Sequence, residues 1–297
     1  MNIFNCPARI VAGLFLLASH TVAAPARRGG FSYPPQMDGA RVETYKIVGD
    51  AKLNLYIFAP AAATNAPAIV FFFGGGWSSG SPEQFEEQCR YLAKRGMVAI
   101  TADYRVATRH HVKPTQCVAD ARSAIRWVRA NAGKLGIDPN RIAAGGGSAG
   151  GHLAAATAFI SEFDEPGEDK NVSATPNALV LFNPALVLAP LEGLTLEGFG
   201  AKMSEDRAGT KPEHISPAHH VAANGPPAII FHGRADTTVP FATAEAFVAK
   251  MKAAGNRCDL VGYEDQQHGF FNKEPFRTKT LDEADKFLVS LGWIKSK

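Results

Sequence analysis

Residues 141–155 read RIAAGGGSAGGHLAA, and this stretch decides the fold. It begins in a short, mostly apolar run, as in a buried strand, and its alanine-rich end is typical of a helix. Gly146 and Gly150 stand two positions either side of Ser148, where the absence of a side chain lets a strand turn sharply into a helix. The pattern predicts that Ser148 is a nucleophile at the carboxyl edge of a sheet, beside free helix amides that favour negative charge. The alternative, a glycine-rich structural loop, is disfavoured by the strand-turn-helix context.

Short apolar runs recur on both sides of this stretch and alternate with longer helical patterns. Continuous apolar strands between helices are typical of a parallel sheet covered on both faces. Two earlier runs partly alternate apolar and polar residues, as in an antiparallel hairpin. We therefore expect an α/β fold with a mostly parallel central sheet and helices on both faces. The hairpin strands are expected at 41–48 and 53–58, the parallel strands at 68–73, 98–104, 141–144, 178–182, 228–231 and 258–263, and the helices at 83–95, 115–131, 152–160, 242–254 and 279–291.

The chain has 297 residues, enough for one large domain with its own core. We expect a single domain over 27–297, in which the long patternless stretch 187–224 is a small cap or lid inserted between two strands. An ordinary crossover with long loops is the alternative for that stretch. Asp138-Pro139 predicts a turn into the strand that leads to Ser148.

A second glycine-rich feature, Phe73-Gly74-Gly75-Gly76-Trp77, ends the first parallel strand. Three glycines let main-chain amides converge on an oxygen without steric interference. We predict an oxyanion hole formed by the N–H groups of Gly75 and Gly76 and completed by that of Ala149. A phosphate-binding loop is the alternative, but neither a Lys-Ser/Thr pair nor G-x-G-x-x-G spacing follows.

A nucleophilic serine needs a base, and nine histidines compete for that role. His268 follows the last predicted strand, so it belongs to a loop at the carboxyl edge, where ligands of parallel sheets gather. Asp236 follows the preceding strand and is the predicted orienting carboxylate. The chain order Ser148, Asp236, His268 is one in which such triads occur. Glu264 and Asp265 are alternative carboxylates, although they belong to the same strand end as the histidine.

The remaining titratable residues have structural interpretations. His110-His111 and His219-His220 are adjacent pairs whose side chains diverge, and no H-E-x-x-H or cysteine cluster supports a metal site. His232 ends a strand and is predicted to be structural, and Asp120 is predicted to be an ion-pair or capping group. We expect neither a catalytic metal nor a cofactor.

The N-terminal residues have the order of a secretory signal. Arg9 is followed by the apolar run 10–18 and then by small residues through Ala26. A run of this length is too short to span a bilayer. We expect a signal peptide at 1–26, cleaved after Ala23, Ala24 or Ala26, and therefore a secreted or periplasmic protein. A buried N-terminal strand or helix is the alternative.

The composition is that of a folded globular protein, with 46% hydrophobic and 20% charged residues. The 31 basic and 28 acidic residues give a net charge of +3 without a basic block, so neither nucleic acid nor a membrane is an expected partner. Once Cys6 leaves with the signal, Cys89, Cys117 and Cys258 remain. Either two of them form a disulfide, or all three are buried thiols.

The glycine-rich strand end at 73–77, the serine turn at 146–151 and His268-Gly269-Phe270 together give the chain a family resemblance. Residues 67–160 and 226–272 resemble the α/β-hydrolase superfamily, most closely the bacterial esterases related to hormone-sensitive lipase and acetyl esterases. The resemblance implies an α/β-hydrolase fold. The chain departs from that branch at Phe73, where histidine is usual, at Gly147, where an acidic residue is usual, and at Ala107-Thr108, where Pro-Glu is usual.

The resemblance also implies a function, a serine carboxylic ester hydrolase with a short-acyl preference. A small molecule or an acetylated or feruloylated carbohydrate is the expected ester. Trp77, Phe270 and Phe271 are predicted to line the substrate pocket, with ordinary core packing as the alternative. Two other functions are considered: a serine peptidase of the prolyl-oligopeptidase type, for which the chain has no room for a propeller, and a non-catalytic ligand-binding protein on the same scaffold.

Overall fold

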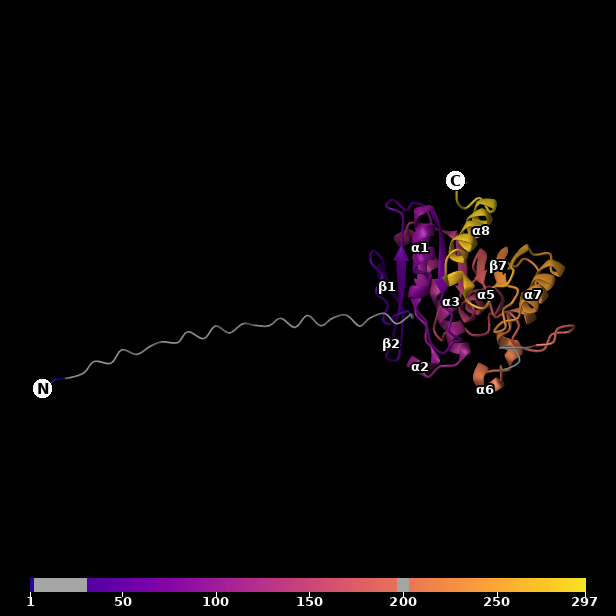
Figure 1. Ribbon diagram of the computed structural model, residues 1–297, viewed down its shortest axis with the longest axis horizontal. Helices are drawn as coiled ribbons and strands as arrows, with labels where there is room; N and C mark the ends of the chain where they lie inside the picture. Colours follow the sequence, from indigo (N-terminus) through magenta and orange to yellow (C-terminus); the bar gives the residue numbers. More distant parts are fainter. Residues whose placement is uncertain (3–30, 197–202) are drawn as a thin grey trace. The chain divides into compact units, whose positions relative to one another are not determined.

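Eight strands of the described residues form one sheet (Figure 1). Their order across the sheet is β1-β2-β4-β3-β5-β6-β7-β8. β1 pairs with β2 and β2 pairs with β4, both in antiparallel fashion, and the remaining pairs, from β4 across to β8, are parallel. The predicted mostly parallel sheet with an opening hairpin is therefore confirmed. The strands are β1 (Arg41–Val48), β2 (Ala51–Phe58), β3 (Ala66–Phe72), β4 (Val98–Ala102), β5 (Ile137–Gly147), β6 (Ala178–Phe182), β7 (Ala228–Gly233) and β8 (Cys258–Tyr263).

The computed structural model describes residues 1–2, 31–196 and 203–297. The predicted signal peptide, residues 1–26, lies outside the described residues except for Met1 and Asn2, and residues 197–202 of the predicted cap lie outside them as well. Residues Phe31–Lys297 form one compact unit, to which all the described strands and helices belong.

Helices cover both faces of the sheet, as predicted (Figure 1). Side chains of α3 (Pro114–Ala130), α5 (Ala149–Phe159) and α7 (Phe241–Ala253) share one core cluster with alternate residues of the central strands, and side chains of α1 (Glu86–Lys94) and α8 (Phe276–Ser290) share the other. In β3, for example, Val70 belongs to the first cluster and Phe71 to the second. This alternation explains why the strand is apolar throughout: both of its faces are buried.

The turn predicted at Asp138-Pro139 is wrong, because β5 already includes both residues. The side chain of Asp138 accepts a hydrogen bond from the N–H of Asn140 at 2.9 Å, which is the local contact that favours such a turn. At this point the pairing of β5 with β3 is irregular, and the register shifts between Ala66 and Ala68.

The described part of 187–224 connects β6 to β7 through short helical segments. These are α6 (Glu205–Ala208) and the 3-10 helices η3 (Pro212–Ile215) and η4 (Pro217–His219). Ala208 and Ile215 are buried in the cluster that contains α5, and the main-chain oxygen of Ile215 lies 2.6 Å from Nε2 of His152 on that helix. The segment is therefore anchored to the helix that follows Ser148.

The three cysteines that lie beyond the predicted signal are free and buried, which favours the interpretation as buried thiols. Burial raises the pKa of Cys258 to about 12, so this thiol is held in its protonated form. No helix within the described residues is both long enough and apolar enough to cross a membrane.

Candidate active site

Ser148 occupies the turn between β5 and α5 with φ at 54°, in the left-handed region that few residues other than glycine adopt. The two flanking glycines are sterically required. A Cβ on Gly146 would collide with the main chain of Gly150, and a Cβ on Gly150 would collide with the main-chain oxygen of Phe72. The main-chain N–H of Ser148 donates to the oxygen of Phe182 at 2.9 Å, which ties the turn to the end of β6.

The structure brings the side chains of Ser148, His268 and Asp236 into one chain of hydrogen bonds. Oγ of Ser148 lies 2.8 Å from Nε2 of His268, and Nδ1 of the same ring lies 2.7 Å from Oδ2 of Asp236. Because an ionised carboxylate only accepts hydrogen bonds, Nδ1 carries the proton and Nε2 is left to accept from the serine hydroxyl. The alternative carboxylates, Glu264 and Asp265, are exposed.

Asp236 is buried and is held by several donors. Its Oδ1 accepts from the main-chain N–H groups of Thr238 and Val239, both at 2.9 Å. Burial raises the pKa of the carboxyl, but the hydrogen bonds to His232 and His268 outweigh burial and hold the pKa well below its usual range. The carboxyl is therefore ionised across the physiological range.

His232 is fully buried, in agreement with its predicted structural role, but it also lies next to the site. Its Nε2 is 2.8 Å from the main-chain oxygen of Val239 and 3.5 Å from Oδ2 of Asp236. The sequence does not indicate this contact, because it depends on how the loop after β7 folds back. In the sequence, only the position of His232 at the carboxyl end of a parallel strand indicates that it lies near a functional site.

Two of the three residues predicted to form an oxyanion hole, Gly75 and Gly76, line the same cavity as Ser148, and the third, Ala149, directly follows the serine. Gly75 and Gly76 have φ of 127° and 62°, which explains why glycine is used there, and both line the cavity with the serine. Among the described residues, the N–H groups of Gly75, Gly76 and Ala149 have no protein partner. The N–H of Gly74, in contrast, donates to Oε1 of Gln84 at 2.6 Å.

Phe73, which stands where the resembling esterases have histidine, is fully buried away from this chemistry. Its ring stacks on that of Tyr104 with centroids 4.1 Å apart, and the tyrosine hydroxyl donates to the main-chain oxygen of Phe73 at 2.7 Å. These contacts hold the strand end that leads into the three glycines.

The cavity at Ser148 has a volume of about 350 Å³ and includes only one of the three aromatic residues predicted to line it. Phe271 lines the cavity, whereas Trp77 and Phe270 do not. Trp77 is buried and donates from Nε1 to Nδ1 of His152 at 3.1 Å. Phe270 packs on the ring of Tyr263. For these two residues the core-packing interpretation holds, and none of the described residues of 187–224 lines the cavity.

Three residues with amide side chains that no sequence pattern indicates also line this cavity, namely Gln84, Asn183 and Asn272. Nε2 of Gln84 donates to Oδ1 of Asn272 at 3.2 Å, and Nδ2 of Asn272 donates to the main-chain oxygen of Gly269 at 3.0 Å. Gln84 therefore links the glycine-rich loop to the loop that carries His268. None of these amides belongs to a recognisable motif. Only Asn183, which directly follows a predicted parallel strand, has a position that signals a site.

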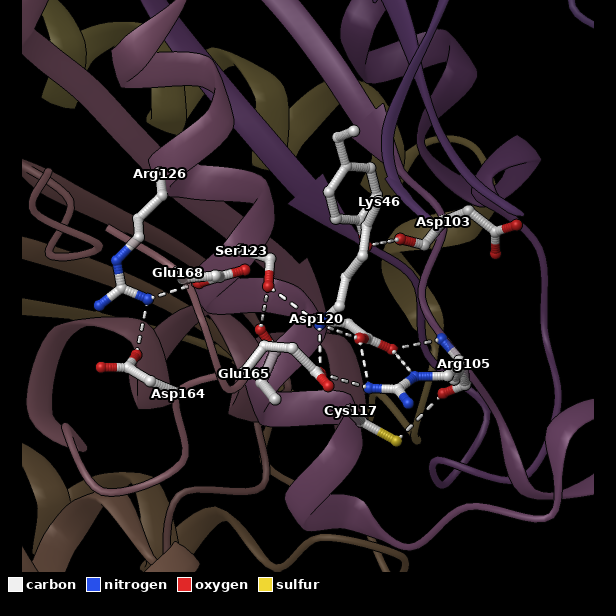
Figure 2. A network of polar contacts seen from close by, with 12 residues as sticks. Lys46, Asp103, Arg105, Cys117, Asp120, Ser123, Arg126, Asp164, Glu165 and Glu168 are labelled. Carbon is white, nitrogen blue, oxygen red and sulfur yellow. Dashed lines mark hydrogen bonds and ion pairs between the residues drawn. The ribbon is translucent and has the colours of Figure 1, made fainter. Parts of the chain in front are cut away.

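Asp120 has the ion-pair role predicted for it, in a network shown in Figure 2. Nη2 of Arg105 and Nζ of Lys46 each lie 2.7 Å from Oδ1 of Asp120, and both cations also contact Glu165. The network joins β1 to α3 and to the loop after α5. No group of three or more His, Cys, Asp or Glu side chains suited to a metal ion occurs among the residues that the structure covers.

A family model described as alpha/beta hydrolase fold matches residues 69–272 of the chain. A solved structure of a thermophilic esterase from Thermogutta terrifontis with propionate bound is 53% identical, covers 90% of this chain and 100% of that chain, and has a TM-score of 0.84. Esterase LipC from Mycobacterium tuberculosis is 32% identical over 69% of this chain and 53% of its own length. An acetylxylan esterase from Xylanibacter ruminicola is 28% identical over 88% of this chain and 52% of its own length. The chain thus spans about half the length of these curated relatives.

Proposed function

The chain belongs to the alpha/beta hydrolase family, and on this premise we propose that it is a serine carboxylic ester hydrolase. The observation that carries the proposal is the hydrogen-bonded chain from Ser148 through His268 to Asp236, with links of 2.8 and 2.7 Å. Hydroxyl, imidazole and carboxylate in this order are what nucleophilic attack on an acyl carbonyl requires.

The proposed reaction has two halves. Oγ of Ser148 attacks the acyl carbonyl carbon while its proton passes to Nε2 of His268, and the ionised Asp236 stabilises the imidazolium. The tetrahedral oxyanion accepts hydrogen bonds from the N–H groups of Gly75, Gly76 and Ala149, each worth roughly 3 kcal/mol by analogy with measured oxyanion donors. Collapse breaks the ester C–O bond, and the departing alkoxide takes the proton from the imidazole. Water, deprotonated by the same ring, then releases the acid and regenerates the serine.

The size of the cavity supports a short acyl group. Its volume of about 350 Å³ is near the lower end of the range for small-molecule sites, roughly 300–1,000 Å³. The propionate in the Thermogutta terrifontis structure supports the same preference. The likeness to an acetylxylan esterase supports a carbohydrate acetyl ester as a natural substrate, with a feruloyl ester as a second candidate.

We further propose that the protein acts outside the cytoplasm as a secreted or periplasmic enzyme. The support is the order of residues at the N-terminus, where Arg9 precedes the apolar run 10–18 and the small residues that end at Ala26.

The test is turnover of p-nitrophenyl esters of increasing acyl length together with labelling by a fluorophosphonate. The wild-type protein is expected to hydrolyse the acetate and butyrate faster than the octanoate and to be labelled once, on Ser148. Ser148→Ala is expected to lower turnover by roughly 10⁴-fold or more. Ser173→Ala, which changes an exposed serine in a loop, serves as the matched control and keeps activity. A folded wild-type protein with neither turnover nor labelling would instead indicate a non-catalytic binding protein.

A further inference from the structure

Asn183 lies immediately after β6 and is attached to the turn that carries Ser148. It is fully buried. Its φ of 35° is in the left-handed region, which asparagine tolerates better than most non-glycine residues. On one side of it the oxygen of Phe182 accepts from the N–H of Ser148 at 2.9 Å, and on the other the N–H of Ala185 donates to the oxygen of Ser148 at 3.3 Å. The backbone on both sides of Asn183 is therefore hydrogen-bonded to that of the nucleophile.

The side chain of Asn183 reaches the loop that carries the base. Its Oδ1 accepts a hydrogen bond at 3.0 Å from the main-chain N–H of Gly269, the residue directly after His268. One carboxamide thus joins the serine turn to the histidine loop, whose positions in the sequence are 120 residues apart.

The amide nitrogen of Asn183 is buried and has no partner among the described residues. Because a main-chain N–H can bond only to the amide oxygen, the contact with Gly269 fixes which way the carboxamide faces. Buried polar groups almost always have a hydrogen-bond partner, and a catalytic role is one of the explanations for an exception. Asn183 lines the same cavity as Ser148, so this unpartnered amide lies at the candidate active site and not in the hydrophobic core.

We propose that Asn183 is a positioning residue, which holds the imidazole of His268 in line with both Ser148 and the leaving group. This inference rests on the proposed esterase function. The imidazole must accept a proton from the serine and then deliver it to the departing alkoxide, two positions that differ by a small displacement. If the loop that carries His268 is free to shift, the imidazole is less often in position to deliver its proton to the departing alkoxide. Misplacement of a catalytic group by about 1 Å costs roughly 100-fold in rate.

The test compares two acetate esters that differ only in the leaving group. p-Nitrophenolate departs without a proton, whereas ethoxide needs general-acid help from the imidazole. Because kcat/KM reports the acylation half of the reaction and the acetyl group is shared, the change in the ratio between wild type and variant reports on delivery of that proton to the leaving group. Loss of a merely structural contact does not change this ratio.

Asn183→Gly removes the side chain and suits the left-handed backbone at this position, so we expect the fold to be retained. We expect kcat/KM to fall about 100-fold for ethyl acetate and about 10-fold for p-nitrophenyl acetate, which changes their ratio about 10-fold. Asn183→Asp keeps an oxygen at the same distance for the N–H of Gly269 and is expected to restore most of the ratio. Asn224→Gly changes an exposed asparagine with φ of 62° and is the matched control, with no effect on either rate.

An unchanged ratio in a folded Asn183→Gly variant overturns the inference, whether both rates stay at the wild-type level or fall together. Failure of Asn183→Asp to restore the ratio also overturns it, since the contact with Gly269 would then not be the cause. A wild-type protein that hydrolyses neither ester refutes the proposed function itself and the inference with it. Wild-type turnover combined with an unchanged ratio refutes the inference alone.

Discussion

Gly147 lies against the ring of Phe271: a Cβ on Gly147 would stand 2.5 Å from the Cζ of that ring. Gly147 belongs to the end of β5, directly before the nucleophile, and Phe271 lies three residues after the proposed base. The phenylalanine therefore occupies the space that a side chain at position 147 would need. This contact accounts physically for the glycine where the resembling esterases have an acidic residue.

Gly147→Ala is predicted to destabilise the protein, because the added Cβ would overlap the buried ring of Phe271 and force it to shift. We expect a loss of about 1–3 kcal/mol in the free energy of unfolding, measured by urea denaturation. Phe271→Leu in the same chain should recover part of that loss. Gly133→Ala is the control, since a Cβ there meets nothing within 4 Å. Equal stability of the two alanine variants would contradict the steric explanation.

Asp236→Asn is predicted to lower kcat for p-nitrophenyl acetate by roughly 10³- to 10⁴-fold near neutral pH. The amide would donate to Nδ1 of His268, which leaves the proton on Nε2 and removes the acceptor for the Ser148 hydroxyl. Asp265→Asn, at an exposed position in the same loop as the histidine, is expected to keep wild-type kcat. The opposite pattern of losses would assign the orienting carboxylate to the loop after β8.

Gln84→Ala is predicted to lower kcat/KM for short esters by roughly 10-fold, through looser placement of the oxyanion donors. The side chain accepts from the N–H of Gly74 at 2.6 Å and donates to Asn272, so its removal frees the glycine-rich loop. Gln84→Glu keeps the acceptor and should retain more activity than the alanine variant when both are assayed with p-nitrophenyl acetate. Wild-type kcat/KM in Gln84→Ala would show that the loop is rigid without this contact.

Asp164 is predicted to stabilise the protein at neutral pH and to lose that effect in acid. Nε of Arg122 and Nη1 of Arg126 each lie 2.6 Å from its Oδ1, and Figure 2 shows the contact with Arg126. Burial raises the pKa of Asp164, but the hydrogen bonds from the two arginines outweigh burial and lower it to about 2. A carboxyl with a lowered pKa contributes stability above its ordinary value of 3.8, and that contribution is lost as the pH falls toward 2.

Asp164→Asn should therefore lower the free energy of unfolding by about 2 kcal/mol at pH 7. The difference from the wild type should shrink between about pH 4 and pH 2 as the wild-type carboxyl is protonated. Asp206→Asn, at an ion pair with Lys113 whose carboxyl is 95% exposed, is the control and should leave the unfolding midpoint unchanged. A difference for Asp164→Asn that is constant with pH would mean that packing, not charge, is responsible.

Export is predicted to remove the N-terminal residues. When the full chain is expressed in a bacterium with a secretory system, the exported protein should begin after Ala23, Ala24 or Ala26. N-terminal sequencing and intact mass of the extracytoplasmic protein measure this directly. A variant with Leu16→Arg and Leu17→Arg should remain uncleaved in the cytoplasm, and cleavage-free export of the wild type would contradict the prediction.

Local patterns were sufficient for the architecture because their causes are local. The runs that form β3 and β6 are apolar throughout since both faces of each strand are buried, and this requirement is visible in the residues themselves. Element ends were less predictable: the strand expected at 98–104 ends at Ala102, and β5 extends back to Ile137 through a proline. Pairing with neighbouring strands, which the local sequence does not contain, decides where a strand stops.

By itself the sequence determined the fold, the turn at Ser148 and the chain order that points to Asp236 and His268. Each follows from a local rule, such as glycines where a Cβ would collide or a loop directly after a parallel strand. Only the tertiary structure decided what surrounds the nucleophile. Asn183 and Gln84 line the cavity, whereas Trp77 is buried in the core against His152. The physical reason is that a side-chain amide or indole has no preferred partner until folding brings distant main-chain groups within hydrogen-bonding distance.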